Sequence, residues 1–303
     1  MEKPVLSLAL LATLAVFAGS ITAQDIFVVK FDANTVGQYN AATGASINSS
    51  FISGLANPFG LALSGNRLFV GNYSGNSIGE YDATTGAAIN NSFISGLSNP
   101  NGIAVSGSDL FVANSGNNTI GKYNATTGVA INSSFITGVV SPRGISLSGN
   151  SIFVGSFTGN SIGVYDATTG SAINSSLITG LNAPCGIAIF GNDLFVSNEG
   201  SNTIGEYDTT SGAAINSSLI TGLSTPRGIA VSGNSLFVAN GSGNSIGEYD
   251  RTTGLAINSS LITGLSSPYS VVVTPVPEPS TFAMAFAGLA FGGYRLFRSR
   301  KWA

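Results

Sequence analysis

Residues 102–136 read GIAVSGSDLFVANSGNNTIGKYNATTGVAINSSFI, and this stretch decides the fold. It contains short apolar segments that are separated by turns rich in Gly, Asn, Asp and Ser. Runs of four to six β-branched, aromatic and small apolar residues between such turns are typical of strands, and no helical period of useful length appears. The stretch therefore predicts successive strands at 102–105, 110–114, 119–123 and 131–136.

The same pattern recurs every 42 residues. One Phe, one Tyr and one Ile of each unit carry the period: Phe27, Phe69, Phe111, Phe153, Phe195 and Phe237; Tyr39, Tyr81, Tyr123, Tyr165, Tyr207 and Tyr249; and Ile47, Ile89, Ile131, Ile173, Ile215 and Ile257. Six units fill residues 24–275. Four strands in about 40–45 residues, repeated in this way, predict an all-β fold, a six-bladed β-propeller of four-stranded blades.

The two ends of the repeated region complement each other. Residues 270–273 form a first strand with no partners after it, and the first unit begins at Ile26 without its own first strand. We expect the last strand to complete the first blade in a 3+1 arrangement, which closes the ring and hides exposed edges. The alternative, a β-solenoid, favours shorter coils and needs capping repeats. The fourth strand is expected to be an outer strand that alternates, with Ile131, Ser133 and Phe135 on one side.

The two termini have patterns of their own. Residues 1–23 combine Lys3, an apolar run at 5–17 and small residues up to Ala23, which predicts a secretory signal peptide. Residues 276–303 begin with VPEPST, continue with an apolar stretch at 282–294 and end in a basic tail. We expect that stretch to be a short membrane helix, with the basic tail left in the cytoplasm.

Two resemblances extend this interpretation. The C-terminal segment resembles the PEP-CTERM sorting signal of Gram-negative bacteria, on its motif and its basic tail: Pro277, Glu278, Pro279, Arg295, Arg298 and Arg300. That resemblance implies an exosortase as partner, an inner-membrane anchor with the propeller in the periplasm, and later release to the cell surface or the extracellular space. The repeats resemble YVTN-type, NHL and SMP-30-like repeats, for example at 110–128, and those families are propellers.

Composition excludes several classes of function. The chain has no His and a single Cys, Cys185, so it has no His-based catalytic triad, no His-ligated zinc and no internal disulfide. Residues 24–275 carry 6 basic and 12 acidic side chains, a net charge of −6, which argues against binding nucleic acid. The Asp or Asn after each repeat Tyr begins a D-x-T-T-G-like turn, for which a structural role is expected and a calcium role is the alternative.

Candidate site residues are those that break the repeat on one face of the ring. The loops on that face are expected to converge on the central channel, and they carry Lys30, Phe59, Arg143, Glu199, Arg227 and Tyr269. Arginine forks suit carboxylate or phosphate, and aromatic rings suit sugars, so these residues predict a site for an acidic glycan or a carboxylate. The alternative is ordinary loop variation.

Two functions from different classes follow. We expect a non-catalytic, monomeric surface or matrix protein without a resident cofactor that binds extracellular polysaccharide or surface proteins. The alternative is a metal-dependent lactonase, hydrolase or lyase of the SMP-30-like type. That alternative would use a divalent metal such as calcium, with Glu199 and the recurrent Asn72, Asn114, Asn198 and Asn240 as candidate oxygen ligands.

Overall fold

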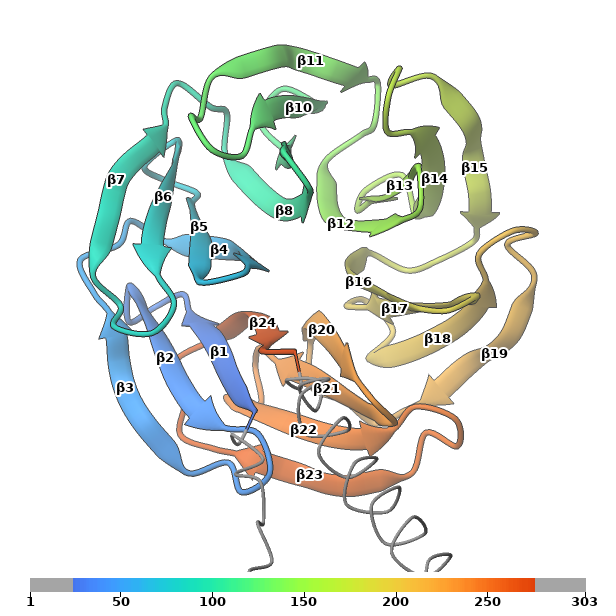
Figure 1. Cartoon of the computed structure of the whole chain (residues 1–303). Helices are drawn as coiled ribbons and strands as arrows, with labels where there is room; N and C mark the ends of the chain where they lie inside the picture. The colour runs from blue at the N-terminus through green and yellow to red at the C-terminus, as the bar shows by residue number, and fades with distance from the viewer. Residues whose placement is uncertain (1–23, 276–303) are drawn as a thin grey trace, which may run out of the picture. The chain divides into compact units, whose positions relative to one another are not determined.

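The computed structural model describes residues 24–275, which form a ring of six four-stranded antiparallel sheets (Figure 1). The six-bladed propeller predicted from the sequence is confirmed. All regular elements in this part of the chain are strands, and no helix within it could cross a membrane. The predicted signal peptide at 1–23 and the predicted membrane helix near the C-terminus lie outside the described residues.

Each blade is a meander that starts at the channel and ends at the rim. Blade 1 consists of β24 (Pro268–Val273), β1 (Asp25–Lys30), β2 (Thr35–Asn40) and β3 (Ser46–Ile52). Blade 2 consists of β4 (Pro58–Ser64), β5 (Arg67–Asn72), β6 (Ser77–Asp82) and β7 (Ala88–Ile94). Blade 3 consists of β8 (Pro100–Ser106), β9 (Asp109–Asn114), β10 (Thr119–Asn124) and β11 (Ala130–Thr137). Blade 4 consists of β12 (Pro142–Ser148), β13 (Ser151–Ser156), β14 (Ser161–Asp166) and β15 (Ala172–Thr179). Blade 5 consists of β16 (Pro184–Phe190), β17 (Asp193–Asn198), β18 (Thr203–Asp208) and β19 (Ala214–Ile220). Blade 6 consists of β20 (Pro226–Ser232), β21 (Ser235–Asn240), β22 (Ser245–Asp250) and β23 (Ala256–Ile262).

The ring closes through blade 1, as the 3+1 prediction required. β24 pairs antiparallel with β1, and Val272 lies opposite Phe27. Beyond the ladder, the Thr274 N–H donates to the Asp25 carbonyl at 2.9 Å, and the Gln24 side-chain amide donates to the Thr274 carbonyl at 2.8 Å. Gln24 and Thr274, at the two ends of the ring, are therefore joined at one seam.

The core lies between blades. Six apolar clusters each join two neighbouring blades, one of them with Cys185 of blade 5 added, and the repeat Phe of the second strand is buried in every one. Phe69, for example, has no exposed surface and packs with Phe93 of its own blade and Ile103 of the next. Burying a side chain of this size contributes roughly 1.5–3 kcal/mol, so the interblade contacts supply the main driving force for closure.

Glycine in the inner strands allows the blades to approach closely at the channel. A Cβ on Gly60 would lie 2.0 Å from the Asn101 carbonyl oxygen, and one on Gly102 would lie 1.9 Å from that of Arg143. In the sixth position the residue is Ser270, on the closing strand β24. The periodic glycines thus hold neighbouring inner strands at backbone contact.

The predicted simple alternation of the outer strands is wrong. In β11, Ile131 is 55% exposed, whereas Ile136 is buried, so the fourth strand does not place Ile131 and Phe135 on one inward face. The β10–β11 pairing shifts register twice, between Ile120 and Lys122 and again between Lys122 and Tyr123. Such bulges insert extra residues into the outer strand and turn the first half of it towards solvent.

The D-x-T-T-G-like turns have the structural role that was expected. The Asp82 Oδ1 atom accepts the N–H groups of Thr84 and Thr85 at 2.9 and 2.8 Å, and the Thr85 hydroxyl at 2.9 Å. The closing Gly86 has a φ of +72°. Hydrogen bonds from the backbone and the hydroxyl of Thr85 lower the pKa of Asp82. The Asp82 carboxylate therefore stabilises its own turn by accepting these hydrogen bonds.

Candidate functional site

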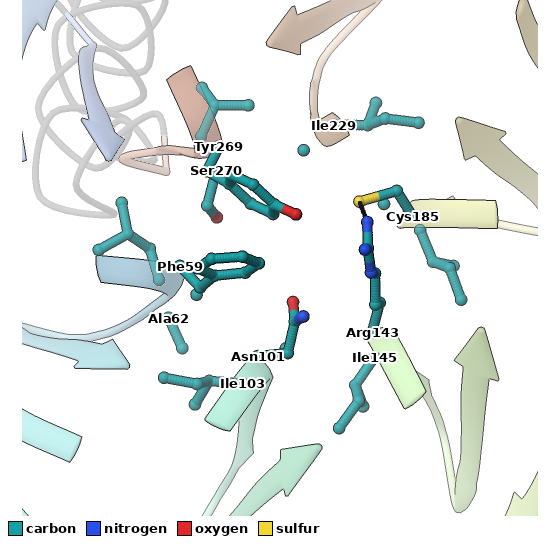
Figure 2. A pocket seen from close by; sticks show the side chains of 18 of the residues that line it. Phe59, Ala62, Asn101, Ile103, Arg143, Ile145, Cys185, Ile229, Tyr269 and Ser270 are labelled. Atoms are coloured by element: carbon teal, nitrogen blue, oxygen red, sulfur yellow. Dashed lines mark hydrogen bonds between the residues drawn. The ribbon is translucent and has the colours of Figure 1, made fainter. Parts of the chain in front are cut away.

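The channel opens on the face where the inner strands begin, which we call the mouth face. The second residues of those strands are Phe59, Asn101, Arg143, Cys185, Arg227 and Tyr269, one from each. Together with Phe31, Tyr73, Phe157 and Glu199 from neighbouring loops, they form the mouth. Beneath it lies a cavity of about 240 Å³, and Figure 2 shows Phe59, Tyr269, Asn101 and Arg143 around it.

One side of the mouth is an aromatic wall made by Phe31, Phe59, Tyr73 and Tyr269. The Phe59 ring stacks on Tyr73 with centroids 4.5 Å apart and lies 3.7 Å from the Tyr269 ring, at 39°. Phe31 meets Phe59 edge-on at 5.1 Å. Burial raises the pKa of Tyr269, so its phenol stays neutral at ordinary pH. Phe59 and Tyr269 are buried, so the half-buried rings of Phe31 and Tyr73 are the more exposed part of the wall.

The other side of the mouth is charged. Arg143 of blade 4 and Arg227 of blade 6 converge on Glu199, which comes from blade 5 between them. The Arg143 Nη1 atom is 2.8 Å from Glu199 Oε2, and the Arg227 Nε atom is 3.7 Å from Glu199 Oε1. Less than a fifth of each of these three side chains is exposed. Five of the six predicted site residues, Phe59, Arg143, Glu199, Arg227 and Tyr269, are thus brought together.

Each arginine has a second support besides Glu199. The Arg143 guanidinium carbon lies 3.2 Å from the Phe157 ring centroid, and that of Arg227 lies 4.3 Å from the Tyr269 centroid. The Arg227 Nη1 atom also donates to the Ser267 hydroxyl at 2.9 Å, whereas its buried Nε has no hydrogen-bond partner. Cation–π contacts of this kind hold a guanidinium in place without neutralising it.

Lys30 does not join this group. Its Nζ donates to the Ser49 carbonyl oxygen on β3, the outer strand of its own blade. In the same repeat position Asn72 and Asn198 are buried, and their Oδ1 atoms accept the N–H groups of Ala56 at 3.1 Å and Asn182 at 3.4 Å. The sequence indicated the correct face for Lys30 but could not show the direction of its long side chain.

Cys185 lies beside the charged group, with its Sγ atom 3.7 Å from Arg143 Nη1. Burial raises the pKa of the thiol to about 11, although Arg143 acts in the opposite direction. The thiol is therefore protonated at neutral pH, which makes it a neutral lining group.

Sequence reasoning missed a ring of asparagines that positions the mouth loops. Asn76 has a φ of +50°, and its Oδ1 accepts the N–H of Asn99 at 2.9 Å. Equivalent bonds, always 23 residues apart, are made by Asn34, Asn118, Asn160, Asn202 and Asn244. The 42-residue period of these asparagines was the available signal. They hold the segment that leads into each inner strand.

Charge is distributed unevenly over the ring. The mouth face carries Lys30, Asp32, Arg143, Glu199 and Arg227, a net charge of +1. The remaining charged residues of 24–275, three basic and ten acidic, give −7. The mouth is therefore the least negative part of an acidic propeller, and an anionic ligand would be directed towards it.

The comparisons with known proteins bear on the tail and on the fold separately. Residues 275–301 match the PEP-CTERM protein-sorting motif. The chain carries a PEP-CTERM sorting signal. This signal, which includes Pro277, Glu278 and Pro279, marks an exported protein that is anchored at the membrane and processed by an exosortase. No curated protein matches the PEP-CTERM chain in sequence.

Two solved structures resemble the propeller of this PEP-CTERM protein. A chain in the crystal structure of a nidogen/laminin complex is 17% identical, with a TM-score of 0.71 over 82% of this chain and 98% of that one. The computationally designed Ika8 protein is also 17% identical, with a TM-score of 0.53 over 81% of this chain and 74% of that one. At this identity the likeness concerns the fold alone.

Proposed function

We propose that this exported propeller is a non-catalytic binding protein that takes acidic glycan chains at its mouth. The observation that carries the proposal is the juxtaposition of Arg143 and Arg227 with the aromatic wall, beside a cavity that Arg143 and two residues of the wall line. Guanidinium groups recognise carboxylates by charge-assisted hydrogen bonds, and aromatic faces pack against the apolar faces of sugar rings. The mouth offers both within reach of one sugar unit.

The size and charge of the mouth support this ligand class. A cavity of about 240 Å³ lies just below the range of roughly 300–1,000 Å³ that is typical of small-molecule pockets, which suits one ring of a glycan rather than a threaded chain. The net charge of −7 on the rest of the ring disfavours wrapping of a polyanion around the rim, so an acidic glycan would engage through the mouth. Surface proteins that present a carboxylate in the same way are a second partner class.

The place of action follows from the sorting signal. We propose that the monomeric propeller is first held at the inner membrane, on its periplasmic side, and then acts at the cell surface or in the extracellular matrix. The tail would have no part in ligand binding.

The metal-dependent enzyme is the competing hypothesis. Its candidate ligands Asn72, Asn114, Asn198 and Asn240 use their side-chain oxygens to accept backbone N–H groups. Within residues 24–275, no three His, Cys, Asp or Glu side chains are grouped to hold a metal ion. Metal analysis of the purified protein tests this hypothesis, because a stoichiometric divalent ion would favour the enzyme.

The test of binding replaces Arg143 and Arg227 together with Ala. We expect this variant to lose retention on immobilised alginate and polygalacturonate, measured against neutral dextran. The matched control replaces Arg67 and Arg251, which pair with Glu80 and Asp193 away from the mouth, and should keep retention. Unchanged retention of the mouth variant, with both variants folded by circular dichroism, would remove the proposal.

A further inference from the structure

Glu199 has the position that a ligand carboxylate would take. Its two oxygens face the two mouth arginines at 2.8 and 3.7 Å, the arrangement that an acidic sugar needs. At the same repeat position the other blades have Phe31, Tyr73, Ser115, Phe157 and Gly241, so this acidic residue is peculiar to blade 5. An internal carboxylate here competes with any carboxylate that arrives from outside.

The arginine pair has less negative charge beside it than three other cations of the ring have. Arg67, Lys122 and Arg251 each pair with a carboxylate: Glu80, Asp109 and Asp193 respectively. Arg143 and Arg227 share one, and the buried Arg227 Nε has no hydrogen-bond partner. A buried, unpaired donor is costly, which leaves a hydrogen bond for a ligand oxygen to make.

The arginines do not depend on Glu199 for their positions. Arg143 is held on Phe157, and Arg227 is held on Tyr269 and by the Ser267 hydroxyl. Removal of the Glu199 charge should therefore leave both guanidinium groups in place at the mouth. The phenol of Tyr269 and the thiol of Cys185 are neutral, so Glu199 is the one anionic side chain among the residues of the mouth.

We propose that Glu199 is the specificity-determining residue of the mouth: it occupies the arginine pair, and a ligand carboxylate binds by replacing its contact with Arg143. This inference rests on the proposed binding of acidic glycans. It selects ligands whose carboxylate sits on a ring that the aromatic wall can hold, because a carboxylate alone gains little by exchanging with Glu199. It also explains why two arginines and one glutamate occur together.

The experiment measures the affinity of a fluorescent tri-galacturonate for the purified protein by polarisation at fixed ionic strength. Glu199→Gln should bind this probe about tenfold more tightly than the wild type, since a negative charge within a few ångströms of the ligand carboxylate is removed. The fully methyl-esterified probe should bind both proteins equally. Glu248→Gln, the same change at a residue hydrogen-bonded to Ser235 outside the mouth, should bind like the wild type.

A second variant distinguishes an effect on ligand binding from an effect on folding. Glu199→Ser introduces the residue that blade 3 has at this position, and it should also bind more tightly. Equal or weaker binding by both variants, at unchanged thermal stability, would overturn the role of Glu199 and leave the binding function standing. An equal gain in Glu248→Gln would overturn it too. If neither wild type nor variants bind the probe or any acidic polysaccharide, the proposed function fails together with this inference.

Discussion

The turns at 82–86 and the mouth use the same kinds of polar group in opposite ways. In the turn, Asp82 Oδ1 accepts three hydrogen bonds from its own loop, and equivalent turns occur in all six blades. In the mouth, Arg143 and Arg227 share a single carboxylate, and no other blade has an equivalent group. The positions that recur in every blade therefore stabilise the ring, whereas the positions that break the repeat are those proposed to bind a ligand.

The largest effect is expected at a regular core position. Phe69→Ala should lower the free energy of unfolding by about 3–5 kcal/mol, because Phe69 is fully buried between two blades. Phe59→Ala, in the aromatic wall, should cost less stability and abolish retention on acidic polysaccharide. Thermal unfolding and the polysaccharide column measure the two effects. If both variants lost stability equally, the distinction between building and binding positions would fail.

A smaller effect is expected at the asparagine ring. Asn76→Ala should lower the free energy of unfolding by about 1–2 kcal/mol, because it removes the bond to Asn99 and leaves at a positive φ a residue without the polar side chain by which Asn tolerates that conformation. Asn76→Gly relieves the backbone and should cost about 1 kcal/mol. Chemical denaturation checks both. A variant Asn76→Gly as unstable as Asn76→Ala would contradict the role of the backbone.

Turns that begin with Asp should lose stability at acid pH, whereas turns that begin with Asn should not. The pKa values of Asp82, Asp166, Asp208 and Asp250 are lowered by hydrogen bonds to the folded turn, so their contribution to stability is present above the ordinary carboxyl pKa. It is lost as the pH falls below about 4, through the lowered values. The melting temperature should fall in this range, and Asp82→Asn should reduce that fall, because an amide oxygen keeps the cap as Asn40 does. A slope unaffected by the substitution would contradict this origin.

The smallest effect is expected at the rim. Ile131→Thr should change the free energy of unfolding by less than about 0.5 kcal/mol and leave ligand binding unchanged, because Ile131 is mostly exposed. Denaturation and retention assays test it. A large loss in either assay would show that the rim strands have a partner, which their exposure in the isolated ring does not reveal.

The sequence predicted the period, the blade count and the closing strand because these depend on residue type at fixed spacing, as with Phe27 and Val272. It failed for the outer strands because the bulges around Ile131 depend on cross-strand register, which leaves no periodic signal in one strand. It grouped five mouth residues correctly, since a ring brings equivalent positions to one axis. The direction of Lys30 and the support of Arg143 by Phe157 depend on rotamers, which spacing does not encode.

The seam in blade 1 has a consequence for protein engineering. Because Gln24 contacts Thr274, the two ends of the ring could be joined by a short peptide and new ends opened in the loop between another pair of blades. All six sheets would then be continuous in the new chain, with the mouth intact. Such a circular permutant separates the binding ring from the position of the sorting tail, so that either can be moved without the other.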